Sequence, residues 1–286
     1  MTIRSVDLAA QGPVVVCAGF QTLRSADVRL LEEAARIGKV HVRLWTDELV
    51  ETATGRKPDF PEAERRFFLE NIRYVEDVSL VSSLEAATQP IGGVRPGAIV
   101  AADDDGTDVA RRACEKAGIP YVELGSDQLR LFPVAVEGGA HIELDAAASA
   151  APRVIVTGCF DWLHSGHVEF FREAAALGEL YVVVGSDRNV RLLKGDGHPL
   201  HKQDERRFMV QAVRQVHQAL ISTGTGWMDA EPEIASIMPR MYVVNEDGDQ
   251  PEKREFCHAR GLEYVVLKRQ PHPGLPRRTS TQLRGF

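Results

Sequence analysis

The sequence predicts an α/β protein made of two tandem domains, each a parallel sheet flanked by helices. Three observations predict this class. Short apolar runs rich in valine alternate with segments of helical periodicity, which is the pattern of strand-helix-strand units. The same order of elements occurs twice, with corresponding residues 140 to 143 positions apart. Residues 146–152, which are rich in alanine, separate the two copies and are typical of a linker.

The composition is that of a globular protein. With 286 residues, the chain is long enough for two separate cores. No apolar run reaches the roughly eighteen residues of a membrane span, and we see no signal peptide. The four cysteines lack the spacing of a metal site or a disulfide framework, so we expect a reducing cytoplasm. The net charge of −7 argues against nucleic acid or a membrane as partner.

The first copy starts with an apolar run at residues 14–20, which predicts a buried strand. A helical pattern follows from Val28 to Ile37 and stops at Gly38, a residue typical of helix ends. Residues 40–45 alternate between apolar and polar side chains and predict a second strand. Each later strand is again separated from the next by a helical segment, so we expect a parallel sheet.

The second copy repeats these elements. Its first strand starts at Val154, its first helix stops at Gly178, and its second strand covers residues 180–184. Matching pairs are Phe20 and Phe160, Gly38 and Gly178, Asp47 and Asp187, Arg65 and Arg206, Cys114 and Cys257, and Tyr121 and Tyr264. Such a repeat indicates an internal duplication. We therefore expect one domain at residues 1–140, a linker at 141–152 and a second domain at 153–286.

The stretch from Val154 to Arg172 carries the strongest functional signal. Its strand leads through Gly158 to His164-Ser165-Gly166-His167 at a helix start. Two histidines three residues apart share one face of the first turn, where free backbone N–H groups attract phosphate. The first copy has Arg24-Ser25-Ala26-Asp27 there, so the fold does not require the histidines. Because Asp27 would repel a phosphate, we expect the first copy to be catalytically degenerate.

These residues resemble the hallmark of the HxGH nucleotidyltransferase superfamily, specifically its cytidylyltransferase-like branch. The match covers Gly158, Cys159, Phe160, Asp161, Leu163, His164, Gly166 and His167. Its relatives include glycerol-phosphate and ethanolamine-phosphate cytidylyltransferases and heptose-phosphate adenylyltransferases. The resemblance implies Rossmann-like, HUP-type domains. It also implies that His164 and His167 contact the triphosphate and stabilise the transition state, with the other matched residues near the nucleotide.

Further motifs extend the resemblance. Lys194, which we expect in a glycine-flanked loop, resembles a lysine that binds substrate and triphosphate. Arg206 matches the arginine of an E-x-R motif with a phosphate-binding role, although Arg65 in the first copy points to a partly structural role. The C-terminal signature for the β- and γ-phosphates comprises Arg278, Thr279, Ser280 and Thr281. The three hydroxyl residues are natural N-caps of a short helix.

Two further groups complete the predicted site. Asn245 and Asp247 follow a strand at the carboxyl end of the sheet, where ligands bind in open α/β folds. In relatives this loop lies near the nucleoside. Mg²⁺ is the expected cofactor, and Asp161 or Asp187 is its possible ligand. Aspartates after strands also cap neighbouring helices, so both alternatives stay open for these two residues.

The expected function is that of a nucleotidyltransferase of the EC 2.7.7 type. It would transfer CMP from CTP to a small phosphorylated alcohol, sugar or phosphonate and release pyrophosphate. The alternative is adenylyl transfer from ATP to a sugar phosphate. The C-terminal signature lacks the Glu-Gly-Ile insert of the longer cytidylyltransferase form, as in the heptose-phosphate adenylyltransferase type, so the base preference stays open.

Other classes are less favoured. A non-catalytic nucleotide-binding regulator is opposed by the intact set of His164, His167, Lys194 and Arg278. A dinucleotide-binding dehydrogenase would need a G-x-G-x-x-G motif, which is missing after the strand that ends at Gly158. We also expect the two halves to pack as an internal pseudo-dimer, and a homodimer of the whole chain is possible.

Overall fold

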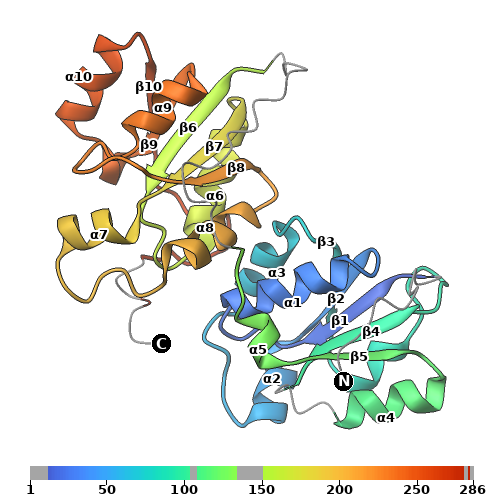
Figure 1. The fold of residues 1–286 in the computed structure, drawn as a ribbon. Coiled ribbons are helices and arrows are strands. Elements are labelled where there is room, and N and C mark those ends of the chain that lie inside the picture. The colour runs from blue at the N-terminus through green and yellow to red at the C-terminus, as the bar shows by residue number, and fades with distance from the viewer. Residues whose placement is uncertain (1–11, 104–107, 134–150, 280–282, 284–286) are drawn as a thin grey trace. The chain divides into compact units, whose positions relative to one another are not determined.

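The computed structural model describes residues 12–103, 108–133, 151–279 and Leu283. The chain divides into two compact units, Met1–Leu131 and Phe132–Phe286. Each unit contains a five-stranded sheet with helices packed against it, which is the predicted α/β architecture (Figure 1). The predicted linker, residues 141–152, lies outside the described residues apart from its last two positions.

The sheet of the first unit has the strand order β3-β2-β1-β4-β5, and its strand pairs are all parallel. Its strands are β1 (Val14–Ala18), β2 (Val40–Trp45), β3 (Val75–Val81), β4 (Ala98–Ala102) and β5 (Tyr121–Leu124). Its helical segments are α1 (Ser25–Ala35), α2 (Asp47–Thr54), α3 (Glu62–Glu70), η1 (Leu84–Thr88), α4 (Asp108–Ala117) and α5 (Ser126–Leu129). Parallel neighbours need crossover connections, and the helices supply them.

The sheet of the second unit has the order β8-β7-β6-β9-β10 and is also parallel. Its strands are β6 (Arg153–Gly158), β7 (Glu179–Val184), β8 (Val216–Ile221), β9 (Met241–Asn245) and β10 (Glu263–Leu267). Its helical segments are α6 (Ser165–Ala175), α7 (Asp187–Lys194), α8 (Gln203–Gln211), α9 (Glu231–Ile237), η2 (Glu246–Gly248) and α10 (Pro251–Ala259). The two sheets therefore share one topology, which confirms the internal duplication.

An unusual backbone conformation is also shared. Phe20 and Phe160 lie at matching positions between the first strand and the first helix of each unit, with φ angles of 48° and 50°. A bulky residue seldom adopts positive φ. Since the conformation occurs in both copies, it belongs to the common scaffold.

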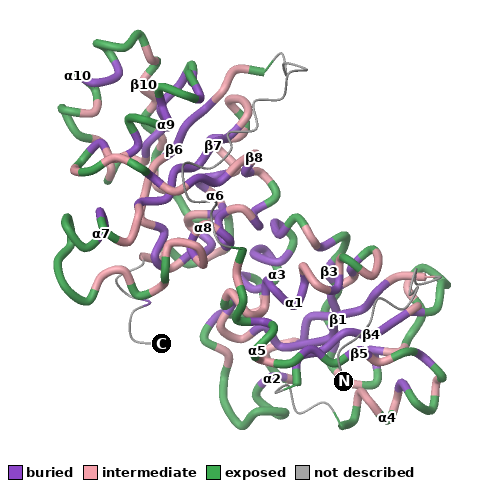
Figure 2. The backbone as a smooth tube through the Cα atoms, in the orientation of Figure 1, coloured by how far each residue is buried: buried purple, intermediate pink, exposed green. Residues whose placement is uncertain are grey.

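The core of each unit surrounds its central strand. Val14 to Val16 in β1 and Val154 to Val156 in β6 are at most 1% exposed. Helices cover both faces of such a strand, so its buried middle positions carry apolar side chains. Figure 2 shows these central strands as buried and the outer helices as partly exposed.

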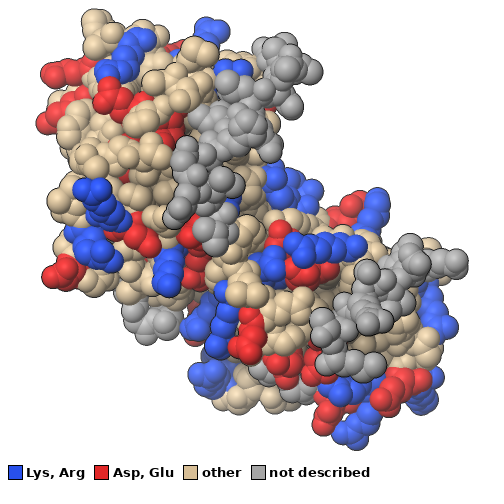
Figure 3. Space-filling model, viewed as in Figure 1, with Lys and Arg blue, Asp and Glu red and all other residues tan. Residues whose placement is uncertain are grey.

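The surface carries mixed charge. On the face shown in Figure 3, basic and acidic side chains are interspersed over the described residues. An anionic ligand therefore has to meet positive charge that is gathered locally. Within the described ranges, no helix combines the length and the apolar character that a membrane crossing requires.

Candidate active site

A pocket of about 340 Å³ opens at the carboxyl ends of β6 and β9. This volume is typical of small-molecule sites. The strand order reverses between these two neighbouring strands, so the loops that follow them diverge and leave a crevice. The predicted site residues that line the pocket are Gly158, Cys159, Phe160, Asp161, His164, Gly166, His167, Lys194, Asn245, Asp247 and Thr279.

The two histidines lie together at the start of α6. His164 is the N-cap residue, and its Nδ1 accepts a hydrogen bond of 3.1 Å from the backbone N–H of Gly166. The rings of His164 and His167 stack with centroids 3.9 Å apart. Because Nδ1 of His164 is an acceptor, the proton of its neutral ring lies on Nε2. That Nε2, like Nδ1 of His167, is buried and has no hydrogen-bond partner among the described residues.

Both histidines are neutral at pH 7. Burial lowers the pKa of His167 to about 4, and the charge of Arg269 lowers it further while Asp247 opposes the shift. The pKa of His164 is also well below its usual range, through burial first and then the neighbouring His167 and Arg269. Buried polar atoms without partners are costly, so their persistence points to a ligand that completes them.

Small residues keep the entrance to this helix open. A side chain at Gly166 would place its Cβ 3.0 Å from the ring of His164, which would disturb the cap. A Cβ at Gly158 would lie 2.8 Å from the ring of Phe160. The Phe160 ring in turn packs edge-on against His167 with centroids 5.3 Å apart. Phe160 therefore supports the histidine pair from the pocket wall.

Three cationic side chains line the pocket: Lys194, Lys253 and Arg269. Lys253 donates a 2.9 Å hydrogen bond to the carbonyl of Gly248, and burial lowers its pKa. The charge of Lys194 is close enough to His167 to lower the pKa of that ring. Phosphate groups would find here a local cluster of positive charge on a chain whose net charge is negative.

We expected Lys194 in a loop, but it is the last residue of helix α7. Ser186 caps the start of this helix by accepting from the N–H of Asn189, and Gly195 ends it with a φ of 84°. The glycines that suggested a mobile loop act instead as the helix stop.

Arg269 and Lys253 were missed by the sequence analysis. Arg269 follows β10 at the carboxyl edge of the sheet, so the rule that singled out Asn245 after β9 would also have found it. Lys253 lies inside α10, and nothing in its local sequence distinguishes it from a solvated helix lysine. Only the fold brings this helix to the pocket.

The described part of the C-terminal segment lies beside the start of α6. Arg278 does not line the pocket, although its charge contributes to the lowered pKa of His164. Its backbone carbonyl accepts a 3.0 Å hydrogen bond from Arg269, whose other nitrogen pairs with Asp247. Thr279 lines the pocket, whereas Ser280 and Thr281 and their predicted helix lie outside the described residues.

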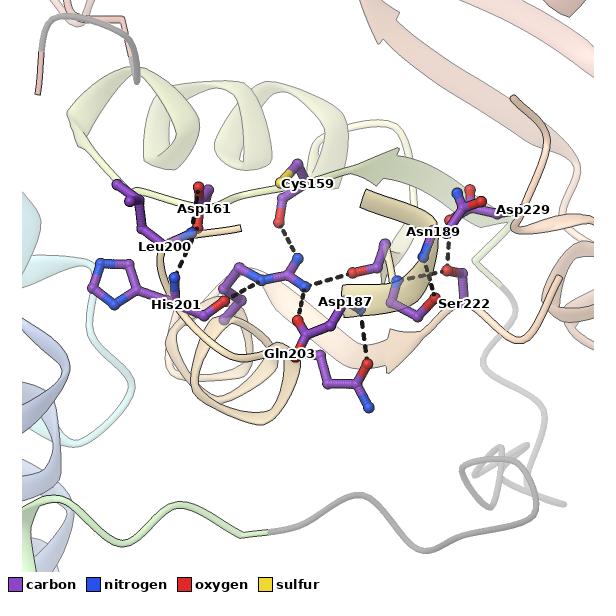
Figure 4. Close-up of polar contacts among 12 residues, drawn as sticks. Cys159, Asp161, Asp187, Asn189, Leu200, His201, Gln203, Ser222 and Asp229 are labelled. Atoms are coloured by element: carbon purple, nitrogen blue, oxygen red, sulfur yellow. Dashed lines mark hydrogen bonds and ion pairs between the residues drawn. The ribbon is translucent and has the colours of Figure 1, made fainter. Parts of the chain in front are cut away.

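Arg206 has the structural role that its counterpart Arg65 indicated, and it does not line the pocket, where the resemblance implied a phosphate-binding role. It is 1% exposed, and its guanidinium donates to the carbonyls of His201, Cys159 and Gly185 and pairs with Asp187 at 2.8 Å (Figure 4). In the first unit, Arg65 donates to the carbonyls of Phe60, Gly19 and Trp45 and pairs with Asp47. The same network in both copies shows that the arginine holds the scaffold together.

The two aspartates considered as metal ligands also have structural partners. Asp161 accepts from the backbone N–H groups of Leu200 and His201 at 2.8 and 3.0 Å. Asp187 is paired with Arg206. Within the described ranges, no cluster of three or more His, Cys, Asp or Glu side chains could hold a metal ion. The described residues therefore do not form a dedicated metal cage.

The loop after β9 faces the pocket as predicted. Oδ1 of Asn245 is buried and has no hydrogen-bond partner among the described residues. Asp247, in the short helix η2, forms its ion pair with Arg269. A buried acceptor beside an acidic residue is suited to donor groups, such as ribose hydroxyls or a base amino group.

The first unit has lost these groups. Asp27 closes the start of α1 by accepting a 2.7 Å hydrogen bond from the backbone of Arg24. At the positions of Lys194, Lys253 and Arg269, the first copy has Thr54, Ala110 and Ser126. The scaffold arginine is retained and the pocket cations are not. This contrast separates residues that the fold needs from residues that the second pocket needs.

A parallel sheet with stacked histidines and clustered cations at its carboxyl edge is an arrangement typical of proteins that bind phosphorylated ligands. Residues 155–278 match the sequence model of the cytidylyltransferase-like family. The chain is also 39% identical over 119 residues to a FAD synthase from Aciduliprofundum boonei, which covers 41% of this chain and 76% of that protein. The chain belongs to the cytidylyltransferase-like family of nucleotidyltransferases.

Other relatives share a smaller part of their length. The bifunctional protein HldE of Photobacterium profundum is 32% identical over 166 residues, which is 52% of this chain and 34% of that protein. HldE of Methylococcus capsulatus is 40% identical over 100 residues, 34% of this chain and 20% of the relative. The chain thus spans about a third or less of these two HldE proteins.

The solved structures that match part of this chain include a lipopolysaccharide core biosynthesis protein from Thermoplasma volcanium. It covers 43% of this chain and 98% of its own, with a TM-score of 0.36 and 23% identity. A universal stress protein in complex with cAMP covers 43% of this chain with a TM-score of 0.26 and 10% identity.

Proposed function

We propose that the second unit transfers a nucleoside monophosphate group from ATP to a small phosphorylated acceptor and releases pyrophosphate. The observation that carries this proposal is the histidine pair. Nε2 of His164 and Nδ1 of His167 are buried without a hydrogen-bond partner among the described residues, and both histidines line a pocket that is also lined by cations. An α-phosphate placed there would supply the missing partners.

The reaction needs charge stabilisation and positioning more than covalent catalysis. An oxygen of the acceptor phosphate attacks the α-phosphorus, the bond from that phosphorus to the bridging oxygen breaks, and pyrophosphate leaves with the electron pair. Nε2–H of His164 would donate to a non-bridging oxygen as its charge develops. His167, stacked against it, would gain a proton as the triphosphate charge raises its pKa.

The cations would hold the remaining phosphates. Arg269 presents a planar guanidinium, which suits pairs of phosphate oxygens. Lys253 lies on the same side of the pocket, after β9, whereas Lys194 comes from α7 after β7. We assign Arg269 and Lys253 to the triphosphate and Lys194 to the phosphates around the reacting centre.

Mg²⁺ is part of the proposal as an ion carried by the substrate. Because Asp161 and Asp187 already have structural partners, Mg²⁺ would be held chiefly by oxygens of the triphosphate. When bound, it would neutralise charge on the β- and γ-phosphates. The roles given above to the histidines, lysines and arginine do not depend on which atoms hold Mg²⁺.

ATP is the donor that the relatives favour. FAD contains an adenylyl group, so the name FAD synthase for the Aciduliprofundum relative supports adenylyl transfer. The missing Glu-Gly-Ile insert at Thr279 points the same way. CTP is the second candidate, because the matching family is described as cytidylyltransferase-like. The acceptor is proposed by class alone, as a phosphorylated alcohol, sugar or related compound.

The test is a pyrophosphate-release screen of the full chain with ATP or CTP against phosphorylated alcohols and sugars and FMN. We expect release with ATP and at least one acceptor, and none with the acceptor alone. Pyrophosphate release with CTP and an acceptor, but not with ATP, would identify CTP as the donor instead. Nucleotide binding without release for any acceptor would favour the non-catalytic regulator.

A further inference from the structure

Helix α7 carries Lys194 but is held to the unit at its beginning. Within this helix, Asn189 and Val190 are buried, whereas the residues from Arg191 to Lys194 are exposed. A short helix has little stability of its own, so its few anchoring contacts determine where its far end lies. The position of Lys194 at the pocket therefore depends on what holds Asn189.

The side chain of Asn189 is bonded twice to one residue. Its Nδ2 donates to the carbonyl of Gly226 at 3.0 Å, and its Oδ1 accepts from the N–H of Gly226 at 2.7 Å. Asn189 is 2% exposed, and the φ of Gly226 is 85°. The paired bonds fix both the distance and the rotation of α7 relative to this glycine. We call this pair the amide clamp.

Gly226 belongs to a closed loop, Ser222–Asp229, that we call the strap. The hydroxyl of Ser222 donates to Asp229 at 2.5 Å and accepts from the backbone N–H of Ser186 at 2.9 Å, as Figure 4 shows beside Asn189. The N–H of Gly224 donates to the carbonyl of Asp229 at 2.9 Å. The strap is therefore closed on itself and tied to the start of α7.

The other side of the strap reaches α10. The ring of Trp227 meets Phe256 edge-on, with centroids 6.3 Å apart. Phe256 lies one turn after Lys253, which lines the pocket. The strap thus contacts two helices, each of which contributes a lysine to the pocket.

The first unit provides an internal comparison. The positions of Asn189 and Ser222 are occupied there by Leu49 and Val81, so neither the clamp nor the tie can form. β3 is followed within three residues by η1, whereas the strap precedes α9 in the second unit. The clamp is present in the unit with the pocket cations and absent from the unit without them.

We propose that the amide clamp between Asn189 and Gly226 is a positioning device that holds Lys194 at the phosphate groups of the bound nucleotide. Asn189 does not touch the ligand and acts through α7. This inference rests on the proposed function for the identity of the ligand.

The test uses the full chain, with MgATP as the probe and calorimetry as the measurement. Asn189→Leu introduces the residue that the first copy carries at this position. We expect Asn189→Leu and Lys194→Ala each to weaken ATP binding about tenfold, the effect of losing one charged contact. The double variant should also be about tenfold weaker, because residues that act through one contact are not additive.

A matched control is Gln211→Leu. The amide of Gln211 also bonds both ways, to the carbonyl of His217 and the N–H of Ala219, but away from the pocket. It should lower the melting temperature and leave ATP affinity unchanged. Gly226→Ala strains the clamp from the strap side, and nothing lies within 4 Å of the added Cβ, so it should weaken binding without touching α7.

The outcomes separate the two proposals. Unchanged affinity in a folded Asn189→Leu protein, or a double variant about a hundredfold weaker, would overturn the positioning role. Unchanged ATP affinity in Lys194→Ala would show that Lys194 does not contact the nucleotide. The amide clamp would then have nothing to position, and the positioning role would be overturned even if the chain binds ATP. No ATP binding by the unaltered chain would instead refute the proposed function itself.

Discussion

At the scale of single residues, the histidine pair has an energetic cost in the free protein. His164 is buried and His167 is partly buried against it, near the charge of Arg269, and neither ring can be protonated easily. Nδ1 of His164 accepts the hydrogen bond of the helix cap, so its Nε2–H is left to donate to a ligand. Binding of an anion should raise the free energy of unfolding, since the two ring nitrogens then gain hydrogen-bond partners.

This cost predicts a dependence of stability on pH. An unfolded histidine has a pKa near 6.5, whereas that of His167 is about 4 in the folded protein. Between these values the unfolded state binds more protons, so the free energy of unfolding must fall as pH is lowered from about 6.5 towards 4. Each histidine should contribute less than about 1.4 kcal/mol per pH unit.

Urea unfolding at several pH values measures this slope. His167→Asn should make it shallower, and ATP should make the unaltered chain take up protons on binding. A slope that is unaffected by removal of His167 would show that its ring is already charged in the folded state.

At the scale of elements, the arginine networks hold loops and strands in place. Arg206, at the start of α8, connects the ends of β6 and β7 through the carbonyls of Cys159 and Gly185. Arg65 performs the same task in the first unit. A buried guanidinium that satisfies several carbonyls leaves all of them unpaired when it is removed.

Arg206→Met should therefore lower the free energy of unfolding by about 3 kcal/mol, the scale of breaking a buried charged network. Arg188→Met, at an exposed position of α7, should change it by less than about 0.5 kcal/mol. Chemical denaturation of both variants is the measurement. A stable Arg206→Met protein that has lost only phosphate affinity would restore the phosphate-binding role.

Elements with a local signal in the sequence could be predicted correctly. The strand at residues 40–45 has the predicted bounds, because its alternating pattern can be recognised without a distant partner. The E-x-R resemblance implied a phosphate-binding role for Arg206, and its structural partners, Cys159, Gly185 and His201, could not be predicted because they come from separate segments. Lys253 was missed for the same reason, since only the packing of α10 brings it to the pocket.

At the scale of the whole molecule, the duplication leaves one equipped copy. The second unit has the histidines and cations, whereas the first has Asp27 and Thr54 at the positions of His167 and Lys194. The packing of the first copy against the second as a pseudo-dimer, and any homodimer, stay predictions for sedimentation measurements of the full chain.

One equipped copy predicts one nucleotide site per chain. Calorimetric titration with MgATP should give a stoichiometry of one, and Asp27→Ala in the first unit should change neither the stoichiometry nor the affinity. Two ATP molecules per chain would show that the first copy has kept a site despite its altered helix start.

The central claim is that His164 and His167 stabilise the transition state of nucleotidyl transfer. Its most direct test is the rate of pyrophosphate release by the full chain and by His167→Ala, with the best acceptor from the screen. We predict a fall in turnover of at least about 100-fold, the scale of losing one preorganised transition-state contact, with circular dichroism unchanged. An unchanged rate in the folded variant would contradict the account.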